Sequence, residues 1–388
     1  MCRIYGINDS GLEYCKAAAE IARQVAGPSA AAVDAAAQFP EKTMSELGRE
    51  GFYGLCIPAE FGGKGQGPRV FAAVVEELAE DCPSSAMIFV MHTAGAQAVI
   101  ASSLLGPRDQ ILREMAAGKH LTTLALSEKG SRSQFWAPVS HLEQAGDGFT
   151  TSASKSWVTA AGHANSYVSS GQNPGAASPL ESTLYLVRRD SRGVRVVSAF
   201  NGMGLRGNDS SPVSLDGLTL ERADLISEPG QGAKVMLEVI LPWFSIGTAA
   251  MANGICRAAV AATAAHLSTT GFEHDGTSLR DLPTLRARLA EMSARTEQSR
   301  ALLGYTLSEI EQPTEATPLY VLQSRLAAIQ AAVDVTDLAM KACGGAAFSK
   351  HLAIERLFRD ARAGWVMAPT ADHLKDFIGR ALTGLPLF

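Results

Sequence analysis

Among the carboxylates and imidazoles of this sequence, His92, Glu238 and Asp372 are three candidates for accepting a proton from a substrate. Imidazole titrates near neutral pH and carboxylates also act as general bases, so all three suit acid-base chemistry. His92, however, stands alone in an apolar segment, where a histidine is more often a hydrogen-bonded core residue. Asp372 follows Thr370 at a spacing that favours the first turn of a capped helix. Glu238 suits a solvated or ion-paired position equally well, so the ionisable residues alone identify no catalyst.

Two other segments carry hydroxyl side chains that could bind a ligand. Ser127 and Ser133 lie in segment 125–134, which taken alone is an ordinary turn. Trp157 and Thr159 lie in a strand-like segment, where a tryptophan normally belongs to the core. The alternative is a cofactor contact, because short hydroxyl donors suit a ligand with carbonyl and phosphate oxygens.

The composition is that of a globular protein. The chain has 388 residues, of which 46% are hydrophobic and 19% charged, enough for two or three packed layers. Its net charge of −5, without a Lys/Arg run, argues against nucleic acid and favours small molecules or proteins as partners. No apolar run is expected to reach the length that a membrane span requires, and Met1 to Gly6 lack the apolar core of a secretory signal. The scattered cysteines predict reduced thiols in the cytoplasm and no metal site.

The elements that would position these residues fall into three groups. Amphipathic helices are predicted at 12–25, 40–50 and 70–80, with another apolar helix from Ser84. Short β-branched strands follow at 121–126, 149–159, 182–187, 194–197 and 213–220, with a hairpin turn at 146–148. From Gly232 onward, apolar stripes at 255–262, 285–303, 322–340 and 374–381 predict an antiparallel four-helix bundle. We therefore expect domains at 1–120, 121–228 and 229–388.

Several motifs, taken together, resemble the acyl-CoA dehydrogenase family over nearly the whole chain. They are Phe52–Gly63, Ala125–Gln134, Lys155–Ala164, Gly202–Asn208, the Cys343-Gly344-Gly345 run, Glu355–Asp360 and Trp365–Thr370. The resemblance implies an α+β fold with an N-terminal all-α domain, a small middle β-barrel domain and a C-terminal four-helix bundle. It also implies FAD as the cofactor and assembly as a homodimer or homotetramer.

The same resemblance assigns FAD contacts residue by residue. The loop hydroxyls fall on Ser127 and Ser133, the aromatic residue beside the isoalloxazine on Trp157, and the group near flavin N5 on Thr159. The complete set of implied FAD contacts is Leu126, Ser127, Ser133, Trp157, Thr159, Lys341, Gly344, Gly345 and Thr370. Arg206, in the third motif, is expected to pair with a carboxylate at a domain junction.

The pattern of the family breaks at the catalytic base. Removal of an α-proton from an acyl thioester requires a carboxylate within hydrogen-bond reach. The usual glutamate position is Ala368, and the alternative position used by some members matches Trp243. Neither side chain can accept a proton, and His92 is the remaining weak candidate.

A second break concerns the positive charge near FAD. Members of the family carry an arginine that reaches the pyrophosphate of a neighbouring subunit, whereas the comparable stretch here, Gly271–Gly276, has none. Two departures add charge elsewhere, since Lys129 and Arg132 replace a proline and a glycine in the loop. Lys341 and Arg132 are hypothesised to restore the missing charge.

Three functions remain open at this point. The first is oxidation (α,β-desaturation) of an acyl thioester on CoA or an acyl-carrier protein, with a non-standard or relocated base. The second is a flavin-dependent monooxygenase on the same fold, although no histidine lies in Ala363–Met367, where that branch often has one. The third is a family member that has lost redox chemistry.

Overall fold

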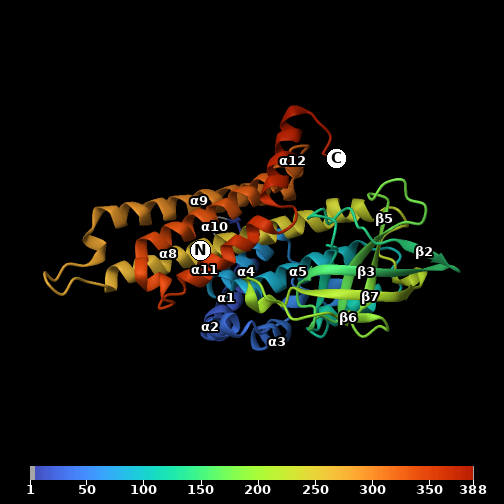
Figure 1. Cartoon of the computed structure of the whole chain (residues 1–388), viewed down its shortest axis with the longest axis horizontal. Coiled ribbons are helices and arrows are strands. Elements are labelled where there is room, and N and C mark those ends of the chain that lie inside the picture. Colours follow the sequence, from blue (N-terminus) through green and yellow to red (C-terminus); the bar gives the residue numbers. More distant parts are fainter. Residues whose placement is uncertain (1–4, 388) are drawn as a thin grey trace.

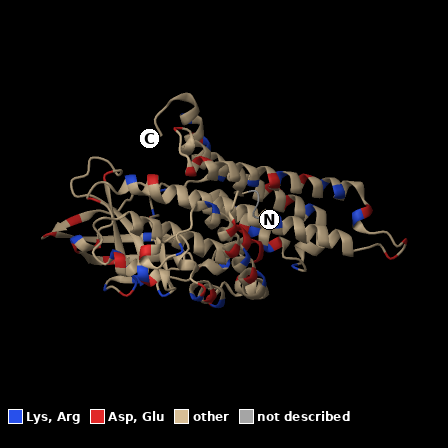
Figure 2. Ribbon diagram, turned by 180° about the vertical axis from the view of Figure 1, so that it is seen from behind, with Lys and Arg blue, Asp and Glu red and all other residues tan. Residues whose placement is uncertain are grey.

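The structure is a computed structural model that describes residues 5–387, so most of the segment examined for a secretory signal lies outside the described residues. Helices come first, two small sheets follow, and a second set of helices closes the chain (Figure 1). This order is the predicted α+β arrangement. Lys and Arg are spread along all three parts and interspersed with Asp and Glu (Figure 2).

The N-terminal part is helical because its segments are short, apolar on one side and bounded by caps. The Asn8 side chain accepts a hydrogen bond from Gly11 N at 2.9 Å and so starts the first helix. Proline stands at the start of the fourth and fifth helices, where its missing N–H costs nothing. The elements are α1 (Asp9–Ile21), π-helix η2 (Ala22–Ala26), α2 (Gly27–Ala36), α3 (Glu41–Arg49), α4 (Pro68–Asp81), α5 (Pro83–Ala101) and α6 (Arg108–Ala116).

Seven strands form the middle part as two sheets. The strands are β1 (Thr122–Ala125), β2 (Leu142–Ala145), β3 (Gly148–Val158), β4 (Ser166–Gln172), β5 (Ser182–Arg188), β6 (Val194–Val196) and β7 (Ser211–Leu220). One sheet has the order β1-β4-β5, and the other β2-β3-β7-β6. The predicted turn at 146–148 joins β2 to β3, with Ala145 opposite Gly148. Between Lys155 and Val158 the β3–β7 register shifts, which changes how Trp157 faces its surroundings.

The C-terminal part contains the long helices. They are α7 (Gly232–Val235), π-helix η7 (Met236–Ile240), α8 (Leu241–Thr269), α9 (Pro283–Glu311), α10 (Thr317–Phe348), α11 (Ile354–Val366) and α12 (Ala371–Thr383). Helices α8, α9 and α10 lie side by side, and α11 packs along α8 and α10 (Figure 1). The stripe predicted at 374–381 forms α12, which stands away at one end of the bundle. The fourth helix of the bundle is therefore α11.

Short 3-10 turns fill several connections: η3 (Phe52–Gly54), η4 (Ala59–Phe61), η5 (Arg206–Asn208), η6 (Arg222–Asp224) and η8 (Leu279–Asp281). Two helical stretches, Pro83–Ala101 and Gly232–Thr269, are long and apolar enough to cross a membrane. The expectation that no apolar run reaches this length is therefore wrong. Of these windows, 89% and 61% are buried inside the fold, as in the core helices of a globular protein.

A buried ionic cluster joins the N-terminal helices to the bundle. The Glu76 carboxylate on α4 forms salt bridges with Arg257 of α8 and Arg300 of α9, each at 2.9 Å. The Tyr5 hydroxyl also donates to the Glu76 carboxylate. Because a buried carboxylate is stable only when it is paired, this cluster fixes how α4, α8 and α9 meet.

Candidate active site

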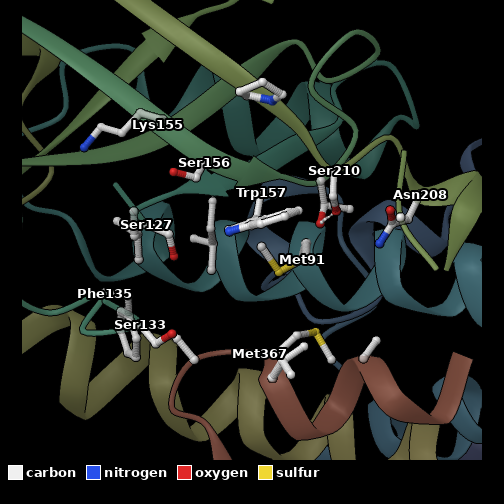
Figure 3. Close-up of a pocket in the computed structure, with 18 of the residues that line it drawn as sticks. Met91, Ser127, Ser133, Phe135, Lys155, Ser156, Trp157, Asn208, Ser210 and Met367 are labelled. Carbon is white, nitrogen blue, oxygen red and sulfur yellow. Dashed lines mark hydrogen bonds between the residues drawn. The ribbon is translucent and has the colours of Figure 1, made fainter. Parts of the chain in front are cut away.

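A cavity of about 950 Å³ lies where the three parts of the chain meet. One side is formed by the β region, through the loop after β1, the end of β3 and the segment around η5. Met87 and Met91 of α5 also line the cavity, as do Phe244 of α8 and Ala368 after α11. Figure 3 shows Met91 and Met367, the residue before Ala368, beside the cavity. A concave, largely apolar cavity with a few polar groups is the usual form of a ligand site.

The loop after β1 is held by a buried ion pair. Lys155 Nζ donates to Glu128 Oε1 at 2.5 Å and to the Ser170 carbonyl at 2.7 Å. The Glu128 carboxylate also accepts Ser140 N at 2.7 Å and Val139 N at 2.9 Å. Burial would raise the pKa of Glu128, but the Lys155 ammonium and these hydrogen bonds hold it below its ordinary value. Glu128 is thus fully committed to positioning the loop.

The backbone of this loop turns sharply. Gly130, Arg132 and Ser133 have φ angles of 105°, 50° and 68°, in the left-handed region that is costly for residues with a Cβ. The turn brings the side chains of Ser127 and Ser133 to the cavity (Figure 3). Two non-glycine residues held there are a sign of a functional loop.

Trp157 is exposed, against the interpretation of it as a core residue. Its φ is 57° and 68% of the residue is accessible, with the indole lying along the cavity (Figure 3). The nearest ring is Phe200, at 6.4 Å and almost perpendicular. Thr159 is buried beyond it, and its Oγ1 lies 3.1 Å from Ser210 Oγ. A flat indole left uncovered beside a group of hydroxyls is suited to a planar, hydrogen-bonding ligand.

The C-terminal signature forms the opposite wall and is held by ion pairs. Arg359 pairs with Asp34 at 2.6 Å and donates to the Met203 carbonyl at 2.8 Å. Asp360 accepts Leu205 N at 2.6 Å, and burial raises the pKa of its carboxyl to about 7. Arg206 was expected to pair with a carboxylate at a junction; it donates to the Asp34 backbone carbonyl at 2.8 Å and lies 3.9 Å from the Asp34 carboxylate. The segment Glu355–Asp360 therefore ties the bundle to both other parts.

The two positions at which the family carries its catalytic base, Ala368 and Trp243, both hold apolar side chains, and only one of them lines the cavity. Ala368 lines it, as the motif predicts. Trp243 does not, because it packs against Phe71 at 5.5 Å between ring centres. The next residue, Phe244, is the one that faces the cavity, so the match to Trp243 was wrong by one position.

His92 is buried in the core and does not line the cavity. Its Nε2 lies 2.9 Å from the Tyr53 carbonyl, and its Nδ1 accepts Thr122 N at 3.1 Å. These partners fix one neutral tautomer, and burial lowers the pKa of the imidazole to about 4. Both nitrogens are in use, so the geometry supports a structural role rather than the catalytic one considered from the sequence.

No described residue replaces the missing base in the cavity. Among the Asp, Glu and His side chains of residues 5–387, Glu128 alone lines it, and that carboxylate is already paired. Glu238 and Asp372 are exposed and point elsewhere. The described cavity therefore provides hydroxyls, an indole, lysine and arginine side chains and apolar surface, but no free carboxylate or imidazole.

Comparison with known proteins agrees with this geometry. Residues 9–119 match the acyl-CoA dehydrogenase N-terminal domain, and residues 230–383 match the acyl-CoA dehydrogenase C-terminal domain. The chain belongs to the acyl-CoA dehydrogenase family. A probable acyl-CoA dehydrogenase of Mycobacterium leprae is 25% identical over 362 residues, which cover 93% of this chain and 92% of that protein.

Solved structures share the fold of this acyl-CoA dehydrogenase family member. Butyryl-CoA dehydrogenase from Megasphaera elsdenii has a TM-score of 0.92 at 20% identity, covering 97% of this chain and 99% of its own. The prolyl acyl carrier protein oxidase AnaB has a TM-score of 0.88 at 18% identity, with coverage of 97% and 99%.

FAD is the cofactor of the family, and the cavity fits it. The exposed indole of Trp157 offers a flat surface, and Ser127, Ser133 and Thr159 offer hydroxyl donors along the same cavity. Leu126 lines it as well. The remaining predicted FAD contacts, Lys341, Gly344, Gly345 and Thr370, do not line the cavity in this chain.

These remaining residues lie on other surfaces. Gly344 has φ 53° and ψ −130°, which interrupts α10, and a Cβ built at either Gly344 or Gly345 would meet nothing within 4 Å. Lys341 pairs with Asp337 at 2.5 Å. Thr370 caps α12, accepting His373 N at 3.3 Å, as the sequence predicts. Of the two cations hypothesised to replace the lost arginine, Arg132 lines the cavity and Lys341 does not.

Proposed function

We propose that this protein is an FAD-dependent oxidoreductase that oxidises the α,β-bond of an acyl thioester. The observation that carries the proposal is one cavity lined by the hydroxyl loop, by the exposed Trp157 and by the segment that ends at Ala368. When bound, FAD supplies the acceptor for the hydride that leaves the β-carbon. The family relatives act on thioesters, and CoA or an acyl-carrier protein is the carrier we propose.

Each wall has its own task in this proposal. Leu126, Ser127, Ser133, Trp157 and Thr159 hold FAD, with the hydroxyls donating to its oxygen and nitrogen acceptors. Met91, Phe244 and Met367 enclose the acyl group. Because these walls come from separate parts of the chain, the ion pairs of Arg359 and Glu128 keep cofactor and acyl group aligned.

The α-proton needs an acceptor that the cavity itself lacks. We propose that hydroxide admitted to the cavity takes this proton, since Glu128 is already paired and the other described carboxylates lie elsewhere. A reaction without a protein base is slower than one with a positioned carboxylate, by about 10²- to 10⁴-fold.

The visible spectrum of the purified protein tests the proposal. We expect a bound yellow flavin that bleaches without oxygen when an acyl thioester is added. The bleaching rate should rise about tenfold per pH unit through the neutral range, because hydroxide concentration sets it. A protein that binds no FAD at any concentration overturns the proposal, and a rate that levels off near pH 7 points instead to a base within the protein.

A second candidate function follows from the same lack of a base. A flavin-dependent monooxygenase uses reduced flavin and oxygen and does not remove an α-proton, so Ala368 would not impair it. The two functions separate experimentally, because the second requires a reductase and oxygen and shows no anaerobic bleaching by thioesters. A protein that binds thioester but no FAD would support the third possibility, a member without redox chemistry.

The assembly we propose is a homodimer or a homotetramer. Gly344, Gly345 and Lys341 are exposed and lie outside the cavity, so a second copy is the partner that could bring them to FAD. Light scattering on the purified protein would measure the assembly, and a monomer that retains FAD would contradict this arrangement. The described cysteines are free thiols, which supports a cytoplasmic location.

A further inference from the structure

Arg325 of α10 is a buried cation that forms no ion pair with any of residues 5–387. Its residue accessibility is 0%, and its Nε and Nη1 make no hydrogen bond with any described residue. Burial lowers the pKa of the guanidinium to about 9, which still leaves it charged at neutral pH. Buried charges in native proteins are almost always paired, so an unpaired one calls for a ligand or a function.

The position of Arg325 is informative because it lies behind the base-free wall of the cavity. Its Nη2 donates to the Met367 carbonyl at 3.1 Å. Its guanidinium also lies over the Phe244 ring, with the central carbon 4.8 Å from the ring centre. Met367 and Phe244 both line the cavity, whereas Arg325 does not. Its charge therefore acts on the cavity through the two residues that it touches.

The two sites where a carboxylate would reach the cavity both lie next to this cation. One is Ala368, which directly follows Met367, and the other is Phe244. Both are apolar. Two cations line this wall, Arg359, which is paired with Asp34, and Arg362, and Arg325 lies behind it, so the wall carries positive charge without a free carboxylate. In a poorly polarisable environment a nearby carboxylate would be strongly favoured, because little solvent screens the pair.

We propose that Arg325 makes this wall a carboxylate subsite, so that the preferred ligand brings the anion the chain lacks. Resting on the proposed function, the inference assigns the substrate class as thioesters whose acyl group ends in a carboxylate. The same chemistry could come from a free small carboxylate bound beside a neutral acyl group. In either case the carboxylate lies against Phe244 and the Met367–Ala368 segment, and Arg325 supplies the opposing charge.

The test compares ligands with the same number of carbons, pentanoyl-CoA and glutaryl-CoA, on the FAD-loaded protein. Calorimetric titration without oxygen gives both dissociation constants, and a second pentanoyl-CoA titration is made in the presence of acetate. We expect glutaryl-CoA to bind about tenfold more tightly or better. In Arg325→Met, which keeps the length of the side chain without its charge, the ratio should fall to about one. Arg325→Lys, which keeps a charge, should retain part of it.

The outcomes separate the alternatives. A purely structural role for Arg325 would change both dissociation constants equally in Arg325→Met and leave their ratio intact, which overturns the inference. An acetate-dependent gain in pentanoyl-CoA binding that Arg325→Met abolishes identifies a free carboxylate as the source. If Arg325→Met does not fold, the titrations of the wild-type protein are still sufficient. Equal affinity of the wild-type protein for both thioesters, without any acetate effect, overturns the inference. Failure of both thioesters to bind would overturn the proposed function with it.

Discussion

The β wall of the cavity brings Ser127, Ser133 and Thr159 to a common face, while the helical wall opposite brings Phe244, Met367 and Ala368. The first wall carries the hydroxyls that we propose donate to FAD, and it is stabilised by a buried ion pair. The second keeps its ion-paired scaffold, Glu355 to Asp360, but presents no proton acceptor. Cofactor binding and proton transfer are therefore separable properties of this fold, carried by opposite walls.

The largest expected effect comes from breaking the ion pair of the β wall. Glu128→Gln leaves Lys155 buried and unpaired, and we expect it to lower the free energy of unfolding by about 3–5 kcal/mol and to weaken FAD retention. Denaturant unfolding and flavin content measure the two effects. Glu143→Gln, at an exposed position of β2, is the matched control. A loss below about 1 kcal/mol would show that the pair does not stabilise the loop.

A substitution can supply the carboxylate that the helical wall lacks. Ala368→Glu places a carboxylate at the family's base position, and we expect anaerobic flavin bleaching by an acyl thioester to become at least about 100-fold faster. Ala368→Gln is the control, because it has nearly the same shape without the proton acceptor. Equal rates for the two variants would mean that the two walls differ in more than the missing base.

The scaffold of the helical wall contains a carboxyl whose ionisation opposes folding. Burial raises the pKa of Asp360 to about 7, above its value in the unfolded chain, so the folded state holds the proton more tightly. Stability from this group is therefore present at acidic pH and is lost as the pH rises to about 7. As the pH rises from 5 to 8, the free energy of unfolding of Asp360→Asn should increase by about 2 kcal/mol relative to that of the wild-type protein. A difference that stays constant over this range would contradict the assignment.

The smallest effect concerns the end of the same wall. Thr370→Ala removes the cap of α12 and should lower the free energy of unfolding by about 1 kcal/mol, whereas Thr370→Ser should keep it. Flavin content is measured alongside, because the FAD contact that the sequence predicts for Thr370 would lower retention as well. Unchanged stability in the alanine variant would contradict the capping role.

The order of the three parts and most of their elements could be predicted because they rest on local periodicity. Helical stripes and β-branched runs depend on neighbouring residues, and the turn at 146–148 depends on its glycines. Strand β4 was missed because Ser166, Ser169 and Ser170 are buried polar residues, which make the segment look like a loop. Burial of serine depends on partners far along the chain, which a pattern cannot show.

Site residues could be predicted where a sequence motif identifies them, but less well where the result depends on the direction in which a helical side chain points. Ser127, Ser133 and Thr159 reach the cavity, as the motifs imply. Trp243 failed because consecutive helical residues point about 100° apart, so a match displaced by one residue selects a different face. The π-helix η7 just upstream also changes the phase of α8.

Arg325 was missed although a signal was present. It lies three residues after Leu322 and four before Ile329, on the stripe that was interpreted as core. An arginine on such a stripe is usually directed to solvent, and the sequence gives no sign that this one is enclosed. The signal is its spacing, which places a charge where every neighbour on that face is apolar.

The cavity has one more consequence, which concerns folding rather than chemistry. Its walls belong to three parts of the chain, so a ligand that fills it contacts all of them at once and binds only when they are docked. By mass action, such a ligand stabilises the docked state in proportion to the logarithm of its concentration over its dissociation constant. Without FAD, the parts are joined by a hydrophobic core that runs through all three and by the clusters around Glu76 and Arg359. Cofactor supply would then control how cooperatively the chain unfolds and how long it survives proteolysis.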